Sequence, residues 1–305
     1  MKRVAILGHT GMVGSALVRR LQSEDADVEL IGASSKEVDL CNLEQVSTWF
    51  KKFKPHYVFV AAARVGGIAD NIEYPVEYMG ENALIGLHTI MCSAQYGVEK
   101  LVYIGSSCLY PAHCMQPMTE EMILTGPFEP TNEGYAIGKL VGMKLAEYYR
   151  KEYNSNFITV LPCNLYGPND DWSESGHVMA SLVRKICDAK KHNLGEVVLW
   201  GTGNPRREFL HVDDCADACI VALKKYSDGM PLNVGSGEDL TIHELAILIA
   251  QAVKYEGKFI FNKNKPDGMQ QKLMDVTRLT RLGWEPDIPL NKGIKEMIHY
   301  YHTNN

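Results

Sequence analysis

The sequence lacks an excess of positive charge, a long apolar segment and a secretion signal. Its 305 residues include 31 lysines and arginines against 37 aspartates and glutamates, a formal net charge of −6. Because it carries no basic tract, we expect no nucleic-acid partner. No run approaches the roughly 20 apolar residues of a membrane-spanning helix, and residues 1–14 are typical of a strand and a turn, not of a signal sequence. We therefore expect a cytoplasmic protein with no membrane partner.

Closely spaced cysteine pairs are also missing. The eight cysteines are scattered and form no C-x-x-C pair, which predicts reduced thiols that are mostly buried as small apolar side chains. His211, Cys215 and Cys219 follow one another at helical spacing, but this spacing does not match a zinc site. We therefore expect no metal.

Short apolar runs alternate with helix-like stretches in the first half of the chain. This alternation predicts an α/β fold, a Rossmann-type doubly wound parallel sheet formed by residues 1–168. The expected strands are Lys2–Leu7, Val28–Ile31, Tyr57–Ala62, Leu101–Ile104 and Phe157–Leu161.

The pattern changes after Pro168, and we expect residues 169–305 to form mainly a smaller C-terminal substrate-binding lobe. Its expected elements are helices over residues 177–191, 240–254 and 290–301 and a strand over residues 197–200. The chain is expected to return to the first domain at about residues 208–236. There Asp213 and Asp214 are expected to cap the start of a helix, because carboxylates accept hydrogen bonds from its free N–H groups.

Glycines at positions 8, 11 and 14 follow the first expected strand and open a helix. The first glycine suits the turn, the second admits a pyrophosphate, and the third allows close packing. The spacing is G-x-x-G-x-x-G and not the G-x-G-x-x-G of many dehydrogenases. It nevertheless indicates a dinucleotide site in this context.

The end of the second expected strand carries hydroxyls and a cation instead of an acid. An NAD site usually has Asp or Glu here, whereas this chain has Ser34, Ser35 and Lys36. These residues favour a 2′-phosphate, so we expect NADP(H) as the cofactor. Asp39 is expected to lie on the adenine side.

Ser106, Tyr135 and Lys139 form the candidate catalytic group. Ser106 follows an expected strand, at the sheet edge where open α/β sheets hold ligands. Tyr135 and Lys139 lie one helical turn apart, so the ammonium is expected to lower the pKa of the phenol. Such a group moves hydride to or from a carbon that bears oxygen, with the tyrosine transferring the proton.

With these motifs, the chain resembles the extended short-chain dehydrogenase/reductase superfamily and, within it, the GDP-L-fucose synthase family. The likeness spans nearly the whole chain and rests on residues 65–68, 105–111, 129–135, 164–168 and 200–207. It implies an NADPH-dependent enzyme that epimerises C3 and C5 of GDP-4-keto-6-deoxy-D-mannose and then reduces C4. Cys108 and His177 match the acid/base pair of that family.

The resemblance also implies the residues around both ligands. The expected cofactor set is Gly8, His9, Thr10, Gly11, Met12, Val13, Gly14, Ser34, Ser35, Lys36, Asp39, Leu40, Ala62, Ala63, Ile104, Gly105, Ser106, Ser107, Tyr135, Lys139, Pro162, Cys163, Asn164, Leu165 and His177. The expected substrate set is Asn132, Asn164, Lys185, Trp200, Arg207, Asp267 and Lys272. The chain departs from the family at Thr10, where many bacterial relatives have Arg, and at Cys163, where Thr is usual.

Other functions stay open at this point. The same chemistry, or only one half of it, is possible on another GDP-linked 4-keto sugar such as a 6-deoxyheptose. A 4,6-dehydratase needs an Asp-Glu pair where Ser107 and Cys108 stand, a 4-epimerase has less use for Cys108 and His177, and a non-catalytic NADP sensor commonly loses the Tyr-Lys pair. A homodimer through residues 82–96 and 135–153 is also expected.

Overall fold

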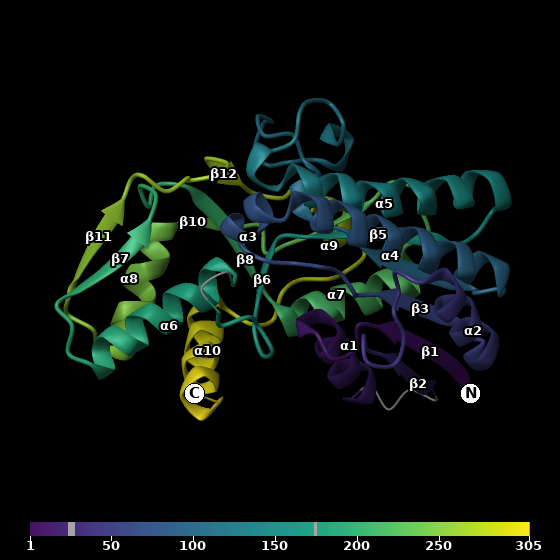
Figure 1. The fold of residues 1–305 in the computed structure, drawn as a ribbon, viewed down its shortest axis with the longest axis horizontal. Coiled ribbons are helices and arrows are strands. Elements are labelled where there is room, and N and C mark those ends of the chain that lie inside the picture. Colours follow the sequence, from purple (N-terminus) through teal and green to yellow (C-terminus); the bar gives the residue numbers. More distant parts are fainter. Residues whose placement is uncertain (24–27, 174–175, 305) are drawn as a thin grey trace.

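The computed structural model describes residues 1–23, 28–173 and 176–304, which form two lobes side by side (Figure 1). The helices are α1 Met12–Ser23, α2 Leu43–Phe53, α3 Ile68–Glu73, α4 Pro75–Gln95, α5 Glu133–Tyr153, α6 Val178–Lys191, α7 Val212–Lys225, α8 Ile242–Val253, α9 Thr277–Arg281 and α10 Leu290–Asn304. The strands are β1 Lys2–Leu7, β2 Val28–Ala33, β3 Tyr57–Val60, β4 Lys100–Ile104, β5 Phe157–Pro162, β6 Asn164–Tyr166, β7 Glu196–Trp200, β8 Arg206–His211, β9 Leu232–Val234, β10 Asp239–Thr241, β11 Lys258–Asn262 and β12 Gln271–Lys272.

The larger lobe is built on a six-stranded sheet in the order β2-β1-β3-β4-β5-β9. All of its neighbouring strands are parallel. Helices α1 and α7 pack together on one side of the sheet, and α4 and α5 pack together on the other (Figure 1). The expected doubly wound fold is therefore confirmed. Helices cover both faces of the sheet, which explains why its strands can be continuously apolar. The strand expected over residues 57–62 is wrong at its end, since β3 stops at Val60.

The smaller lobe has its own strands and its own apolar core. Strands β6, β10 and β12 each pair with β8, and β7 pairs with β11. Helices α6, α8 and α10 enclose a buried cluster that is separate from the main core. The segments 210–234 and 269–284 instead contribute buried side chains to the main core. The proposed domain limits, residues 1–168 with 208–236 and residues 169–305, stay a prediction.

Two helix starts differ from the sequence-based expectation. The first N–H groups of α7 are capped by His211, whose Nδ1 accepts a hydrogen bond from the backbone N–H of Asp213. Asp214 instead accepts hydrogen bonds from the backbone N–H groups of Asp287 and Ile288. Helix α8 begins two residues later than expected, because Thr241 and Glu244 form a capping box.

No helix in the part of the chain that the structure describes is long and apolar enough to cross a membrane. All eight cysteines are unpaired, and five of them are buried.

Candidate active site

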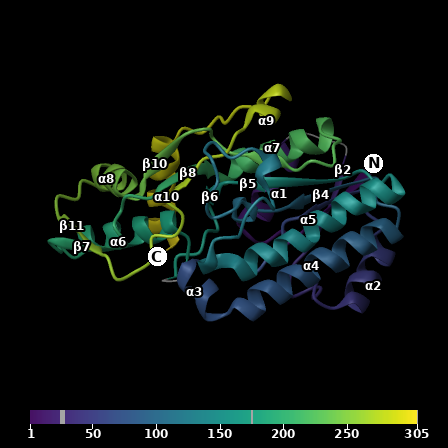
Figure 2. The same ribbon diagram turned by 90° about the horizontal axis from the view of Figure 1, so that it is seen from above.

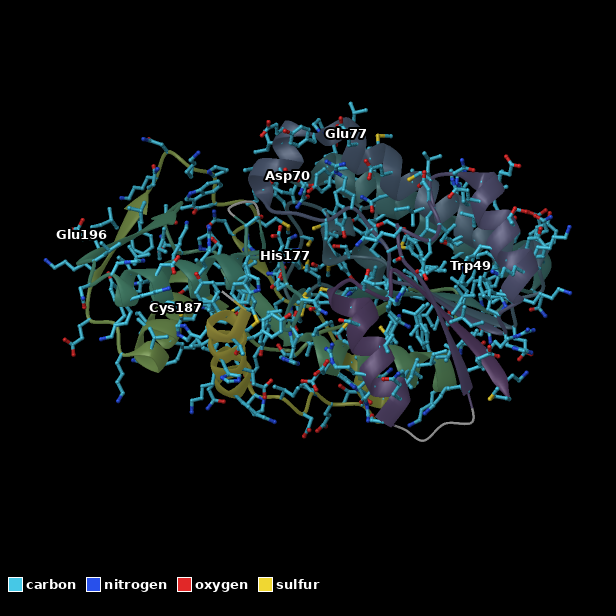
Figure 3. All side chains as sticks on the ribbon, turned by 60° about the horizontal axis from the view of Figure 1, so that its bottom comes forward. Trp49, Asp70, Glu77, His177, Cys187 and Glu196 are labelled. Atoms are coloured by element: carbon cyan, nitrogen blue, oxygen red, sulfur yellow. The ribbon has the colours of Figure 1, made fainter. Side chains whose placement is uncertain are left out.

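A cavity of about 1080 Å³ runs from the glycine turn to the smaller lobe. Its walls include the carboxyl ends of β1, β3, β4 and β5, where open parallel sheets bind ligands. Nearly all expected site residues line it, from Gly8 to Lys272. The three that do not line it are His9, Gly14 and Lys36. Figure 3 shows His177 near the middle of the molecule, between its two ends.

The three glycines of the turn differ in what surrounds them. Gly8 has φ +86°, a left-handed conformation that suits glycine. Gly11 lines the cavity, and a Cβ atom there would be in ordinary contact with the Gly8 carbonyl oxygen at 3.5 Å. A Cβ atom on Gly14 would lie 2.1 Å from the same oxygen, which is impossible without backbone movement. Gly8 therefore makes the turn, Gly11 leaves room for a ligand, and Gly14 allows close packing. These are the roles expected for a pyrophosphate-binding turn.

An acid, Glu37, lies beside the two serines that follow β2. Ser34 and Ser35 line the cavity, whereas the exposed Lys36 does not. The Ser34 hydroxyl and backbone N–H both donate to the Glu37 carboxylate at 2.7 Å. This interaction lowers the pKa of Glu37. The hydroxyl of Ser34 is therefore already bound to a carboxylate, and the cation of Lys36 lies outside the cavity.

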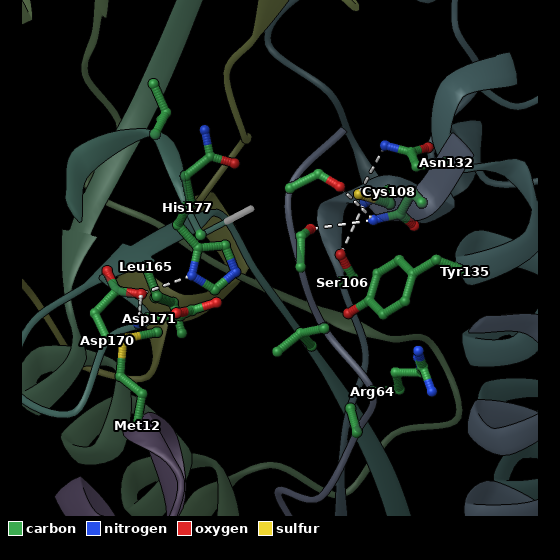
Figure 4. Close-up of a pocket in the computed structure, with 18 of the residues that line it drawn as sticks. Met12, Arg64, Ser106, Cys108, Asn132, Tyr135, Leu165, Asp170, Asp171 and His177 are labelled. Carbon is green, nitrogen blue, oxygen red and sulfur yellow. Dashed lines mark hydrogen bonds and ion pairs between the residues drawn. The ribbon is translucent and has the colours of Figure 1, made fainter. Parts of the chain in front are cut away.

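Ser106 and Tyr135 come from different elements and face each other. Ser106 lies just after β4, where its Oγ accepts a hydrogen bond from the Cys108 N–H at 3.1 Å. Tyr135 lies in the first turn of α5, and Figure 4 shows its ring beside Ser106. Burial and the nearby Cys108 raise the pKa of Tyr135, and a hydrogen bond with Ser106 partly offsets them. The expectation of a lowered tyrosine pKa is therefore wrong for this structure.

Lys139 does not lower the pKa of Tyr135 as expected. Its side chain is buried, and its Nζ lies 4.5 Å from the centre of the Tyr103 ring. Burial lowers the pKa of Lys139 to about 7, so much of its charge is lost near neutral pH. Burial thus disfavours the ammonium form of Lys139, and its side chain packs over Tyr103 and so does little to stabilise a phenolate at Tyr135.

Cys108 lies in the turn after Ser106, on the wall that faces the cavity. Its Sγ receives hydrogen bonds from Asn132 Nδ2 at 3.4 Å and from Lys272 Nζ at 3.5 Å. Lys272 was expected to bind the nucleotide sugar, but its ammonium here lies against the thiol. The thiol therefore lies in a polar and positively charged setting, not in an apolar one.

His177 directly precedes α6, without a side-chain capping hydrogen bond, and lies across the cavity from Tyr135 and Cys108 (Figure 4). Its Nδ1 is 2.7 Å from Oδ1 of Asp170. Burial lowers the pKa of His177, but the hydrogen bond to Asp170 and the charges of Asp170 and Asp171 outweigh burial and raise it above its ordinary value. The thiol and the imidazole thus lie on opposite walls of one cavity.

The end of the cavity in the smaller lobe carries the cations expected for a diphosphate. Lys185 Nζ lies 5.9 Å from the ring centre of Trp200. Arg207 donates to the Asp267 carbonyl oxygen at 3.2 Å. The Asp267 carboxylate accepts hydrogen bonds from the N–H and hydroxyl of Thr202 at 2.7 and 2.8 Å. In this structure Asp267 therefore holds the turn around Gly201 instead of facing the cavity as a free acceptor.

Sequence reasoning missed five charged residues that line the cavity, namely Arg64, Glu81, Glu129, Asp170 and Asp171. Arg64 pairs with Glu81 at 2.8 Å and packs over the Tyr78 ring. Asp170 lies only two residues after the motif that ends at Pro168 and seven before His177. Asp170 follows one motif and Arg64 directly precedes another, residues 65–68, so a usable signal was present for both.

The family model described as "NAD dependent epimerase/dehydratase family" matches residues 4–235. The chain belongs to this family. Within it, a GDP-L-fucose synthase of Sinorhizobium fredii is 44% identical over 304 residues, covering 99% of this chain and 96% of that one. The resemblance to GDP-L-fucose synthases that the motifs indicated is thus confirmed over the full length.

Solved structures of this family have the same architecture. A GDP-6-OMe-4-keto-L-xylo-heptose reductase from C. jejuni superposes with a TM-score of 0.91 at 32% identity, covering 100% of this chain and 98% of that one. A GDP-L-fucose synthetase from Naegleria fowleri bound to NADP gives a TM-score of 0.91 at 26% identity, covering 99% and 94%. The epimerase/dehydratase fold therefore extends over both lobes of this chain.

Proposed function

We propose that this protein converts GDP-4-keto-6-deoxy-D-mannose to GDP-L-fucose with NADPH, by C3 and C5 epimerisation followed by C4 reduction. The observation that carries the proposal is one cavity whose walls hold Ser106, Tyr135, Cys108 and His177 together. The full-length similarity to GDP-L-fucose synthases supports the choice of sugar.

The glycine turn supports NADP(H) as the cofactor. The unobstructed Gly11 backbone and the tight Gly8–Gly14 packing leave a cradle for a pyrophosphate at the start of α1. Ser34, Ser35 and Asp39 then lie at the adenine end, and Lys139 and Asn164 lie in the inner part of the cavity. When bound, the cofactor supplies the hydride for C4. The similarity to an NADP-bound GDP-L-fucose synthetase supports the phosphorylated form.

Epimerisation depends on proton-exchanging side chains that lie on opposite walls of the cavity. The carbons C3 and C5 both neighbour the C4 ketone, so removal of either proton gives an enolate whose oxygen Ser106 and Tyr135 can stabilise. Cys108 and His177 exchange protons with the carbon from opposite faces, which inverts it. The enolate oxygen keeps the same two hydrogen bonds for both carbons.

Reduction uses the same oxygen-binding pair. As hydride reaches C4, Tyr135 donates its proton to the oxygen, and Ser106 holds that oxygen in place. A phenol with a raised pKa stays protonated before the reaction and so is ready to donate. The cations Lys185 and Arg207 are proposed to hold the diphosphate, and Trp200 offers an apolar face to the nucleotide.

The experiment is product analysis by NMR after incubation with NADPH and the GDP-linked 4-keto sugar in D₂O. We expect GDP-L-fucose with deuterium at C3 and C5. The Cys108→Ser variant should lose deuterium entry by a factor on the order of 100 or more, while its affinity for NADPH stays unchanged. Wild-type rates of deuterium entry in this variant would refute the role of Cys108.

Turnover of a GDP-linked 4-keto-6-deoxyheptose in the same assay, but not of the deoxyhexose, would show that the substrate is a heptose. The proposed chemistry would stay the same. No turnover of any 4-keto sugar would refute the enzymatic proposal.

We also propose a cytoplasmic homodimer. The free state of all eight cysteines supports a reducing compartment. Helices α4 and α5, which lie alongside each other on one edge of the molecule (Figure 2), carry exposed apolar side chains suited to a second copy.

A further inference from the structure

Asp170 is a buried carboxylate that no step above uses. Its side chain has 0% exposure, and its Oδ1 accepts hydrogen bonds from His177 Nδ1 at 2.7 Å and from the Asp171 N–H at 2.8 Å. Its Oδ2 is also buried and has no hydrogen-bond partner among the described residues. A buried carboxylate is costly unless an opposite charge compensates it. A protonated imidazole at His177 supplies that charge.

The same contact determines which ring nitrogen of His177 is free. An ionised carboxylate only accepts hydrogen bonds, so the proton in the short contact belongs to Nδ1 of the imidazole. The remaining nitrogen, Nε2, is then the one available for chemistry. Figure 4 shows the ring extending from Asp170 into the cavity, toward the wall that carries Ser106 and Tyr135.

We propose that Asp170 is a positioning residue that fixes the orientation of His177 and holds it as the proton donor of the epimerisation. This inference rests on the proposed function. In the donor step the Nε2–H bond breaks and a C–H bond forms at C3 or C5 with the electron pair of the enolate. The imidazole is left neutral and regains its proton from solvent.

The electrostatics agree with this geometry. Asp170 and Asp171 are the charged groups that raise the pKa of His177, against the effect of burial. Tyr135 and Cys108 face it from the opposite wall (Figure 4). Because the pKa is raised, His177 keeps its donor proton to higher pH than an ordinary imidazole. Loss of the Asp170 charge should therefore shift its titration to lower pH.

The first test is substrate-free NMR titration of the full-length protein labelled at its histidine rings. The His177 signals are assigned by their absence in His177→Gln. In the wild type we expect the proton of the neutral ring on Nδ1 and a pKa above 6.5. In Asp170→Asn we expect the pKa to fall by about one unit. The matched control Asp171→Asn keeps the hydrogen bond, so its shift should be much smaller.

The second test is the pH profile of deuterium entry at C3 and C5. If the pKa of His177 falls by about one unit, Asp170→Asn loses about tenfold of the exchange rate at pH values above both pKa values. At pH values below both, its rate should approach that of the wild type. A purely structural role would instead reduce the rate equally at all pH values.

The outcomes separate the two proposals. A His177 titration that Asp170→Asn leaves unchanged, or a neutral ring with its proton on Nε2, overturns the inference whatever the substrate is. Failure to turn over the GDP-sugar would instead refute the proposed function, since the NMR test needs no substrate. A pKa shift that is clear in Asp170→Asn and much smaller in Asp171→Asn supports the positioning role.

Discussion

At the residue scale, the sulfur of Cys108 is held by side chains from distant parts of the chain. Lys272 is 164 positions away and lies 3.5 Å from the sulfur. The ammonium of Lys272 is thus a charged group in direct contact with the reactive atom of Cys108. Reactive cysteines typically lie in electropositive surroundings, so Lys272 should govern the reactivity of Cys108.

We predict that Lys272→Met slows alkylation of Cys108 by iodoacetamide by a factor on the order of ten. Mass spectrometry of the digested protein follows Cys108 separately from the other seven cysteines. The matched control is Lys265→Met, because Lys265 Nζ lies 4.6 Å from the Trp200 ring centre and donates no hydrogen bond to the thiol. Equal alkylation rates in the wild type and Lys272→Met would refute this electrostatic role.

At the element scale, α4 and α5 approach each other closely because glycines lie between them. A Cβ atom on Gly86 of α4 would lie 2.9 Å from Cα of Gly142 on α5. A Cβ atom on Gly142 would lie 2.4 to 2.8 Å from three atoms of Tyr103. Lys139 lies over the same Tyr103 ring. The spacing of the two helices therefore also affects the position of a candidate catalytic lysine.

We predict that Gly142→Ala lowers the free energy of unfolding by about 1–3 kcal/mol, because the added methyl group overpacks the Tyr103 ring. Urea denaturation measures this change. The control is Gly195→Ala in the other lobe, just before β7, where a Cβ atom meets nothing within 4 Å. Its stability should stay equal or rise by up to about 1 kcal/mol, since alanine has less backbone freedom to lose on folding. Equal losses in both variants would contradict the packing argument.

The sequence predicted elements well where the signal is local. The apolar runs of β1 and β5 and the glycine turn before α1 are visible in neighbouring residues, and all three are confirmed. The cap of α7 was assigned wrongly, because Asp214 binds the backbone at Asp287 and Ile288, far along the chain. A contact of this kind leaves no periodic pattern.

The same distinction between local and distant signals applies to the candidate site. Tyr135 and Lys139 were found from their spacing on one helix, but their surroundings were not. The pKa of Tyr135 is raised and not lowered as expected, because the tyrosine is buried and lies near Cys108. Asp170 looked like a loop residue, and only the folded loop shows that its carboxylate is buried against His177. Burial and distant partners, which set pKa values, are properties of the fold.

At the scale of the whole molecule, α4 presents one face to the sheet and another to solvent. Tyr78, Ile85 and Ile90 are buried, whereas Val76, Leu84 and Met91 are 78%, 39% and 41% exposed. These three exposed positions lie seven or eight residues apart and so follow one side of the helix. An exposed apolar stripe of this kind on a folded chain is typical of an interface with another protein surface.

We predict that the protein forms a dimer through this stripe, with twice the 34.1 kDa mass of the chain in light scattering. Leu84→Glu should shift the mass to that of one chain, because the interface would bury an unpaired carboxylate. The matched control is Ile247→Glu on α8, which replaces an apolar side chain of similar exposure, 37%, in the other lobe and should leave the dimer intact. A monomeric wild type would refute the dimer. A dimer that survives Leu84→Glu and dissociates with Ile247→Glu would place the contact on the other lobe.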